Sequence, residues 1–357
     1  MGIRYYTARL FNNFLRNLSN DSRAIVYHSR GDPIKVTQID KITLPQIAPD
    51  ELRLRVLMAP INPSDINMIQ GRYGYLPSLP AVGGNECVAE IQQIGSNVKN
   101  FKIGDRVFPA EPGNGTWCEN CNVKANEMIK LPVDVPSVVG ASIVVNPCSA
   151  YRMVKDYGAQ PGDYIIQNGA TSGVGEAVIQ FAKIFGIRTI NVVRESTSDD
   201  IKQYLTDLGA DYVITDKFLQ SASMKNLIKD VGAPKLALNC VGGQSATELF
   251  RNLGQDGVMV TFGAMARDPP KIPMGKFIFL NLKIVGFWLT QWKAKNSNNE
   301  AYQLMLDDIF KFSVEGKFKA PRFKFFDFDD FKTPLEQIAA PGVSKGKSML
   351  VMDRSYI

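Results

Sequence analysis

The sequence predicts an α/β protein of two domains, one mainly β and one built on a doubly wound parallel sheet. A chain of 357 residues exceeds the size at which one hydrophobic core usually stops growing. Up to about Pro147, short apolar strands are separated by turns. Beyond it, strand and helix signals alternate, as in βαβ units with right-handed crossovers. Strand signals return after Trp288, so we infer that the C-terminal segment rejoins the first domain.

The mainly β part begins near Ala24. Residues 51–57, Glu-Leu-Arg-Leu-Arg-Val-Leu, alternate with period two, as a half-buried strand does. Residues 87–91 and 106–108 are predicted as further strands, the second after the turn signal Gly-Asp at 104–105.

The middle part is predicted as a parallel sheet with covering helices. Apolar residues at 178, 181, 182 and 185 have the spacing of a helix that packs on a sheet, and Gly186 ends it. A second helix over 200–208 closes at Gly209. The predicted strands are residues 164–167, 189–193, 212–214, 236–240 and 258–262.

The C-terminal part carries a helix over residues 301–314 and strand signals at 317–326 and 348–352. Its strand-rich end resembles the first part of the chain more than the middle.

The first twenty residues contain Arg4, Arg9 and Arg16, no acidic residue, and apolar residues at helical spacing. This composition is typical of a mitochondrial presequence, which we expect over residues 1–23 of a matrix protein. The alternative is a frayed basic helix at the start of a cytosolic protein.

Charge and hydropathy limit the partners. The net charge of +6 comes from scattered Lys and Arg, which argues against nucleic acid as the main partner. The longest apolar stretch, residues 277–292, is interrupted by Asn281, Lys283 and Gln291, so we expect a soluble protein with no membrane partner.

Five cysteines, at 87, 118, 121, 148 and 240, favour a reducing compartment over a disulfide framework. Cys118 and Cys121 form one CxxC, but the only histidine is His28, so a zinc site lacks ligands and we expect no metal. A redox CxxC normally opens a helix, whereas this one is predicted in a loop, which favours free thiols at the surface or half-buried.

Residues 168–175, Asn-Gly-Ala-Thr-Ser-Gly-Val-Gly, lie between a predicted strand and an amphipathic helix. Glycines there allow a tight turn and a close approach to a pyrophosphate, whose charge the helix N-terminus favours. The spacing departs from a strict GxGxxG, but its strand and helix context favours dinucleotide binding over a structural glycine loop.

The dinucleotide is indicated by the end of the next predicted strand. Arg194 matches a 2′-phosphate, while its neighbour Glu195 is the candidate for ribose hydroxyls. Because a guanidinium pairs with a phosphate in bidentate geometry, we interpret Arg194 as the reader and NADPH as the cofactor.

The segment of residues 67–77 carries Tyr73 and Tyr75 between glycines and prolines. Taken alone, this string indicates a turn with aromatic residues. These residues alone leave open whether Tyr73 takes part in chemistry or is a turn aromatic.

Several motifs resemble the medium-chain dehydrogenase/reductase superfamily, in its zinc-free, quinone-oxidoreductase-like branch. They are residues 62–65 (Asn-Pro-Ser-Asp), 83–86 (Gly-Gly-Asn-Glu), 104–107 (Gly-Asp-Arg-Val), 168–175 and 239–243 (Asn-Cys-Val-Gly-Gly). Within it, residues 70–74, 145–148, 150–152 and 286–292 resemble the mitochondrial 2-enoyl thioester reductases. The resemblance runs from about residue 24 to 352.

The resemblance implies a GroES-like catalytic domain over residues 24–148 and 291–357, and a Rossmann-type NADPH-binding domain over 149–290, with the active site in the cleft between them. It implies NADPH-dependent reduction of trans-2-enoyl thioesters of CoA or acyl carrier protein to saturated acyl thioesters in mitochondrial fatty acid synthesis. It also implies a homodimer, in which cofactor domains pair edge to edge.

The resemblance also assigns residues. Tyr73, which lies between the matching glycines, gives the proton to the α-carbon while hydride goes to the β-carbon; Tyr75 is its rival within the segment. Zinc alcohol dehydrogenases have histidine where this chain has Asn85, which agrees with the absence of metal ligands. The cofactor-binding positions implied are Asn146, Thr171, Ser172, Gly173, Val174, Arg194, Glu195, Ser196, Phe262, Gly263, Ala264, Met265, Phe287, Trp288, Leu289 and Lys347.

Some of these positions also allow a purely structural role instead of cofactor binding. Asn146 would then cap a turn, and the aromatic residues at 287–289 would belong to the core between the domains. Lys345 is the alternative to Lys347 for the lysine that binds the cofactor. Gly169, Thr171 and Phe262 depart from the family's commoner residues, which affects the cofactor's hydrogen bonds. Two alternative functions stay open at this point. One is an NADPH-dependent quinone or activated-alkene reductase, and the other is a nucleotide-sensing binding protein with little turnover.

Overall fold

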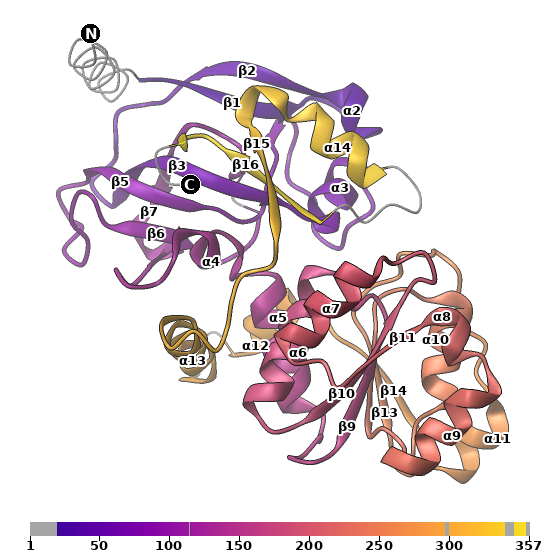
Figure 1. The fold of residues 1–357 in the computed structure, drawn as a ribbon. Coiled ribbons are helices and arrows are strands. Elements are labelled where there is room, and N and C mark those ends of the chain that lie inside the picture. The colour runs from indigo at the N-terminus through magenta and orange to yellow at the C-terminus, as the bar shows by residue number, and fades with distance from the viewer. Residues whose placement is uncertain (1–19, 114, 297–299, 340–345, 355–357) are drawn as a thin grey trace, which may run out of the picture. The chain divides into compact units, whose positions relative to one another are not determined.

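The computed structural model describes residues 20–113, 115–296, 300–339 and 346–354 (Figure 1). The chain forms two compact units. Unit 1 contains the described residues up to Val144 and those from Phe323, and unit 2 runs from Val145 to Arg322.

Unit 1 is mainly β and contains two sheets. One has the strand order β2-β1-β4, and the other the order β15-β16-β3-β5-β6-β8, with β7 also paired to β3. The strands are β1 (Asp21–Tyr27), β2 (Thr37–Thr43), β3 (Glu51–Ile61), β4 (Ala81–Val82), β5 (Val88–Ile94), β6 (Arg106–Pro109), β7 (Asn120–Lys124), β8 (Met128–Lys130), β15 (Phe323–Asp327) and β16 (Lys347–Val351).

Short helices close this unit around a core of buried aliphatic side chains and Trp117. The C-terminal strand β16 lies inside the larger sheet, parallel to β15 and antiparallel to β3. The helices are α2 (Pro33–Val36), α3 (Pro63–Ile69), η1 (Ala125–Glu127), α4 (Ser137–Ser142), η2 (Phe328–Asp330) and α14 (Lys332–Ala339).

Unit 2 contains a six-stranded parallel sheet of order β11-β10-β9-β12-β13-β14. Its strands are rich in Val, Ile and Leu because helices cover both faces. The strands are β9 (Tyr164–Gln167), β10 (Arg188–Val193), β11 (Tyr212–Thr215), β12 (Leu236–Asn239), β13 (Val258–Thr261) and β14 (Lys283–Gly286). The five predicted strands of the middle part are confirmed as β9–β13, within one residue at each end.

The helices of unit 2 flank the sheet on both sides, with α6 and α7 on one face and α9–α11 on the other (Figure 1). The predicted helix ends are confirmed: Gly186 and Gly209 follow α6 and α7 with φ of 70° and 115°, a backbone that favours glycine. The helices are α5 (Asn146–Asp156), α6 (Gly173–Ile184), α7 (Asp199–Leu208), α8 (Asp216–Leu219), α9 (Ala222–Val231), α10 (Gly243–Arg251), α11 (Met274–Phe279), α12 (Leu289–Asn296) and α13 (Glu300–Val314).

The second boundary of unit 2 falls after Arg322, whereas the sequence places it at residue 291. The chain after α13 stays in unit 2 because Phe318 stacks on Phe181, with ring centroids 4.8 Å apart. The Gln180 carboxamide accepts from Lys319 N (2.8 Å) and donates to Lys319 O (3.1 Å). These contacts also explain why the predicted strand over 317–326 begins only at Phe323.

Residues 1–19, which carry most of the expected presequence, lie outside the described residues. The expected presequence ends at residue 23, but β1 begins at Asp21, so the last three of its residues belong to the folded unit. Ser22 is buried, and its hydroxyl donates to the Asn120 carbonyl oxygen (2.8 Å).

The CxxC lies on extended chain rather than in the expected loop. The backbone at Cys118 forms an isolated antiparallel β-bridge with the backbone at Ala24. Cys121 belongs to β7, which pairs with β3. The five cysteines are free thiols. Cys121 is half-buried, as expected, but Cys118 is buried, because the chain around it is extended and packs in the core of unit 1. Burial raises the pKa of the Cys87 and Cys240 thiols, the latter to about 12.

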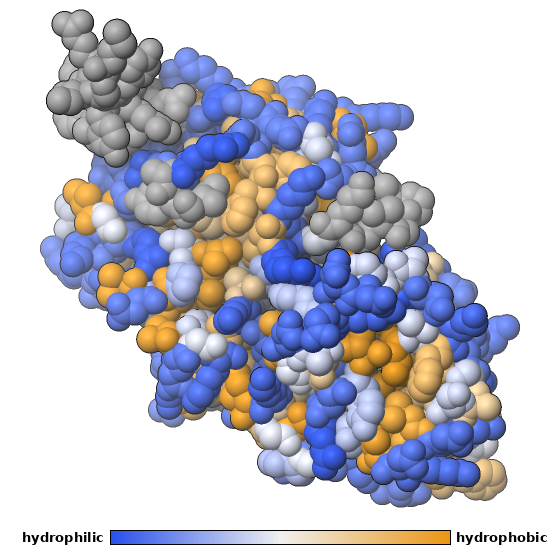
Figure 2. Space-filling view, viewed as in Figure 1, coloured by the Kyte–Doolittle hydropathy of each residue, from blue (hydrophilic) through white to orange (hydrophobic). Residues whose placement is uncertain are grey.

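On the face drawn in Figure 2, hydrophilic residues dominate and apolar residues are interspersed among them. Among the described residues, no helix combines the length and apolarity needed to cross a bilayer.

Candidate active site

The carboxyl ends of the parallel strands in unit 2 carry most of the predicted site residues. All strands of a parallel sheet have their carboxyl ends on the same side. The segments after β9, β10, β13 and β14 therefore lie along the carboxyl-terminal side of the sheet. This arrangement brings together residues 171–174, 194–196, 262–265 and 287–289.

The segment between β9 and α6 has the backbone of a phosphate-binding turn. Ser172 caps α6, and its hydroxyl accepts from Gly175 N at 3.1 Å. Gly169 has φ of 62°, and a Cβ there would lie 2.4 Å from the Cys240 sulfur. A Cβ at Gly175 would lie 2.6 Å from the Gly169 carbonyl oxygen. Only glycine fits these two positions, and the first amides of α6 remain available to an anion.

The segment after β10 presents Arg194, Glu195 and Ser196 as exposed residues. The Asp216 carboxylate accepts from Glu195 N at 2.9 Å, which fixes the backbone of this turn. Among the described ion pairs none involves Arg194, so its guanidinium is available to an anionic ligand.

The segments after β13 and β14 are tied to neighbouring strands. Phe262 N donates to Asn239 O and Phe287 N to Thr261 O, at 3.0 and 2.9 Å. Met265 is 62% exposed and Trp288 38%, whereas Phe287 and Leu289 are buried. The exposed side chains can contact a bound cofactor, and the two buried ones support the segment.

Asn168 and Asn239 are two further residues of this region, which the sequence motifs contain without indicating a role. Asn168 Nδ2 donates to Asn239 Oδ1 (2.9 Å), and Asn168 Oδ1 accepts from Cys240 N (2.8 Å). The pair joins β9 to β12, where the chain order of the strands reverses and doubly wound sheets bind ligands. The sequence signal for this pair is an asparagine at the end of each of two predicted apolar strands.

Asn146 is the first residue of α5 and is buried in unit 2. Tyr73 and Lys347 belong to unit 1. Tyr73 follows α3 in an irregular loop and is half-buried, whereas Tyr75 is 54% exposed.

Lys347 begins β16 and joins a buried polar cluster, which we name the Asp65 cluster: Asn62, Asp65, Asn85, Glu86 and Lys347. Its ammonium donates to Asn62 Oδ1, and Asn62 Nδ2 donates to Glu86 Oε2 (2.6 Å). Asp65 accepts from Asn62 N (2.6 Å) and from Asn85 Nδ2.

Burial raises the pKa of the Asp65 carboxyl to about 7. The hydrogen bond from Asn62 N lowers this pKa, and the nearby Glu86 carboxylate raises it. Within the described residues, no group of three or more His, Cys, Asp and Glu side chains is arranged to hold a metal ion. At the Asn85 position the carboxamide instead donates to Asp65.

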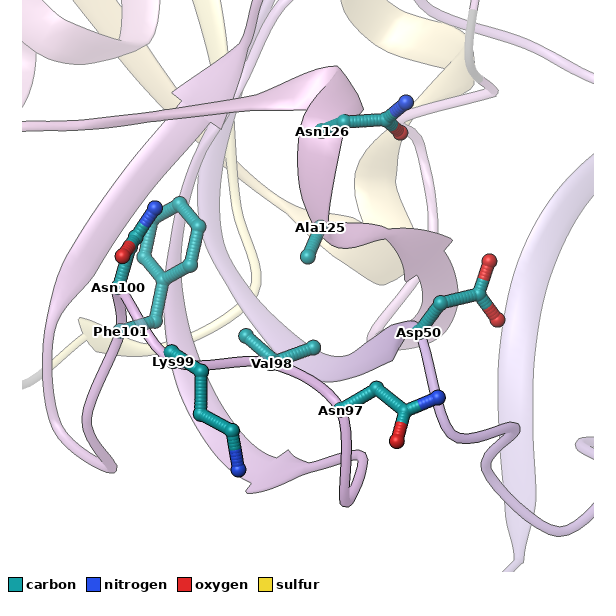
Figure 3. A pocket seen from close by; sticks show the side chains of 8 residues that line it. All are labelled: Asp50, Asn97, Val98, Lys99, Asn100, Phe101, Ala125 and Asn126. Carbon is teal, nitrogen blue, oxygen red and sulfur yellow. The ribbon is translucent and has the colours of Figure 1, made fainter.

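A pocket of about 440 Å³ in unit 1 lies away from these residues (Figure 3). Its lining is Asp50, Asn97, Val98, Lys99, Asn100, Phe101, Ala125 and Asn126. Asp50 precedes β3, whereas Asn62 of the Asp65 cluster follows it, so about eleven extended residues, roughly 35 Å, separate the pocket from the Tyr73 side. None of the predicted site residues lines this pocket.

Two family models match the chain: the alcohol dehydrogenase GroES-like domain over residues 48–178 and the zinc-binding dehydrogenase over residues 173–309. Together with the six-stranded parallel sheet and its glycine turn, they define a two-domain medium-chain dehydrogenase/reductase. As predicted, a GroES-like domain and a Rossmann-type domain make up the fold.

The chain is 46% identical over 334 residues to the human protein "Enoyl-[acyl-carrier-protein] reductase, mitochondrial", covering 92% of this chain and 88% of that protein. The Arabidopsis thaliana protein of the same name is 37% identical, over 91% and 87% of the two chains. The chain therefore belongs to the family of mitochondrial enoyl-[acyl-carrier-protein] reductases.

Among solved structures, the complex of Etr1p with NADP and crotonyl-CoA has a TM-score of 0.86 and 32% identity, over 93% of this chain and 99% of that one. The Etr1p/Etr2p heterodimer of Candida tropicalis gives 0.85 and 32%, with the same coverage. An Escherichia coli quinone oxidoreductase complexed with NADPH has a TM-score of 0.79 at 23% identity, over 92% and 99%, which shows a shared fold.

Proposed function

We propose that this chain is an NADPH-dependent trans-2-enoyl thioester reductase that converts enoyl-CoA or enoyl-acyl carrier protein to the saturated acyl thioester. The observation that carries the proposal is the 46% identity to a mitochondrial enoyl-[acyl-carrier-protein] reductase over 92% of the chain. The glycine turn at the start of α6 supports it, because this backbone accepts a pyrophosphate.

The residues at the strand ends fit NADPH. Thr171–Val174 surround the N-terminus of α6, where backbone amides and the helix dipole favour phosphate. Arg194 is exposed after β10, and its guanidinium matches the 2′-phosphate, with Glu195 and Ser196 beside it. The residues after β13 and β14 would contact the remainder of the cofactor. We propose Asn146 and Lys347 as further contacts.

Bound NADPH supplies a hydride to the β-carbon of the enoyl thioester. Electron density then moves to the α-carbon and the thioester oxygen, so the α-carbon requires a proton. Tyr73 holds a proton on its phenolic oxygen at neutral pH and donates it there. Its half-buried position limits exchange with water, whereas Tyr75 is too exposed to hold a fixed geometry.

The chain carries out this reaction in mitochondrial fatty acid synthesis, and we place it in the matrix. A basic, acid-free stretch precedes Asn20, as in a presequence. Since Ser22 and Arg23 make contacts within unit 1, removal of a presequence would leave β1 intact if cleavage occurs before Asp21.

We propose that the chain forms a homodimer through the β14 edge of unit 2. In the described sheet, β14 pairs only with β13 and leaves its other side open. Near that edge Ile284 is 42% exposed and Phe279 of α11 is 81% exposed. An open strand edge beside exposed apolar side chains favours pairing with a second copy.

A spectrophotometric assay of NADPH oxidation tests the function. We expect turnover with a trans-2-enoyl-CoA and little with a quinone. Preferred turnover of the quinone would indicate an activated-alkene or quinone reductase, and NADPH binding without turnover of either would indicate a nucleotide-binding protein.

A further inference from the structure

The loop of residues 70–77 carries Tyr73 and has no regular secondary structure. At its start, Gly71 N donates to Met68 O (3.0 Å) and Arg72 N to Asn67 O (2.7 Å), which ends α3. Exposed residues such as Tyr75 and Leu76 show that burial of apolar surface contributes little to holding this loop. Other contacts must fix the position of the Tyr73 hydroxyl.

Arg30 and Gly31, which lie between β1 and α2, contact the loop at both ends. Gly31 N donates to Ile69 O (3.0 Å), next to the beginning of the loop. Arg30 Nη2 donates to Pro77 O (2.9 Å) at its end. Between these two hydrogen bonds, the aliphatic stem of the Arg30 side chain lies next to Gly71.

Gly71 shows how closely that stem fits. Its φ is 72°, and a Cβ built there would lie 2.8 Å from Arg30 Cδ. The positive φ favours glycine at position 71, and a side chain there would displace the Arg30 stem. The loop and the Arg30 side chain are packed as one unit.

The guanidinium itself is partly withdrawn from water. Arg30 Nη1 is buried and has no hydrogen-bond partner among the described residues. Burial raises the pKa of the Tyr27 phenol, and the positive charge of Arg30 lowers it.

We propose that Arg30 is the positioning residue of the Tyr73 loop: by holding Pro77 O and packing under Gly71, it fixes the Tyr73 hydroxyl for proton transfer. The inference rests on the proposed role of Tyr73. Misplacing a reacting group by about 1 Å costs on the order of 100-fold in rate, so loss of the contact should act on kcat. Arg30 is not among the residues proposed to contact NADPH, so the KM for NADPH should change little.

The test is a double-mutant cycle with Tyr73→Phe. Arg30→Met keeps most of the stem and removes the guanidinium; we expect kcat on a trans-2-enoyl-CoA to fall by ten- to a hundredfold, with the KM for NADPH within about twofold. In a Tyr73→Phe background the same change should cause no further loss of kcat, because the residue being positioned is gone.

Gly71→Ala provides a second variant: it displaces the Arg30 stem and also strains the loop backbone at a φ of 72°, and its loss of kcat should likewise depend on Tyr73. Arg23→Met is the matched control: Arg23 is also an arginine of the β1 segment, but it pairs with Glu119 and Asp329, away from the loop, so kcat should be unchanged. The thermal melting temperature of each variant identifies any that fail to fold.

Equal losses of kcat from Arg30→Met with and without Tyr73 would overturn the positioning role, and so would an unchanged kcat in both Arg30→Met and Gly71→Ala. An unimpaired Tyr73→Phe single variant would instead refute the proposed function of Tyr73. The two failures are therefore distinguishable.

Discussion

Replacing Asp65 by asparagine should change how the stability of unit 1 depends on pH. Asp65 is 2% exposed, and burial raises the pKa of its carboxyl to about 7, from an ordinary value of 3.8. Between these values the folded protein keeps a proton that the unfolded chain has lost. The free energy of unfolding of the wild type therefore falls as the pH rises through this window.

The size of the effect follows from the same pKa. Each pH unit in the window lowers the free energy of unfolding by about 1.4 kcal/mol. Between pH 5 and pH 8 the wild type should lose roughly 2 to 3 kcal/mol relative to Asp65→Asn, and the change should level off above pH 7. Asparagine does not titrate, so the variant lacks this dependence.

Urea unfolding at several pH values measures the difference. Trp117 is fully buried in unit 1, so replacing Trp288 and Trp292 by phenylalanine in both proteins makes fluorescence report on unit 1. Asp105→Asn is the control: burial tends to raise the pKa of Asp105, but the bonds from Lys130 and Lys102 N lower it overall. The pKa of Asp105 therefore lies below 4 in both the folded and the unfolded protein. The difference in the free energy of unfolding between the wild type and Asp105→Asn should be constant from pH 5 to 8. A constant difference for Asp65→Asn as well would refute the reasoning.

Three further predictions concern the proposed function. Tyr73→Phe should lower kcat by about 10²- to 10⁴-fold while the Kd for NADPH is unchanged, and Tyr75→Phe should keep its turnover; equal effects of the two would contradict the assignment of Tyr73. Arg194→Ala should raise the KM for NADPH by about ten- to a hundredfold, since bonds to a charged group contribute about 1.5–3 kcal/mol, and leave that for NADH unchanged; equal changes for both cofactors would remove the 2′-phosphate role. Phe279→Asp should convert a dimer to a monomer in light scattering, and an unchanged mass would exclude this edge as the interface.

Much of unit 2 was predictable because its signals are local. The strand at residues 164–167 is a short apolar run, and Gly209 has the left-handed backbone that commonly follows a helix. The strand ends then follow from the rule that parallel strands finish at one edge. For that reason residues 171–174 and 194–196, which follow two predicted parallel strands, can be expected in one region of the fold.

The Asp65 cluster was not predictable, because its members are distant in the chain. Lys347 bonds to Asn62 across 285 residues, and nothing in the pattern near Lys347 indicates which buried acceptor it meets. The same holds for Arg30, whose partner Pro77 is 47 residues away. The boundary after Arg322 depends on the stacking of Phe318 on Phe181, a pairing that hydrophobic periodicity cannot specify.

The position of β16 has a consequence for the order in which the chain folds. Unit 2 is one continuous segment and can fold as soon as it has been synthesised, or has entered an organelle from its N-terminus. Unit 1 cannot, because β16 lies between β15 and β3, and Lys347 at its start completes the Asp65 cluster. Asn62, the residue before α3, acquires its Lys347 partner only when β16 has been synthesised. A chain shortened by about ten residues at the C-terminus should therefore retain a folded cofactor unit and leave β3 with an open edge.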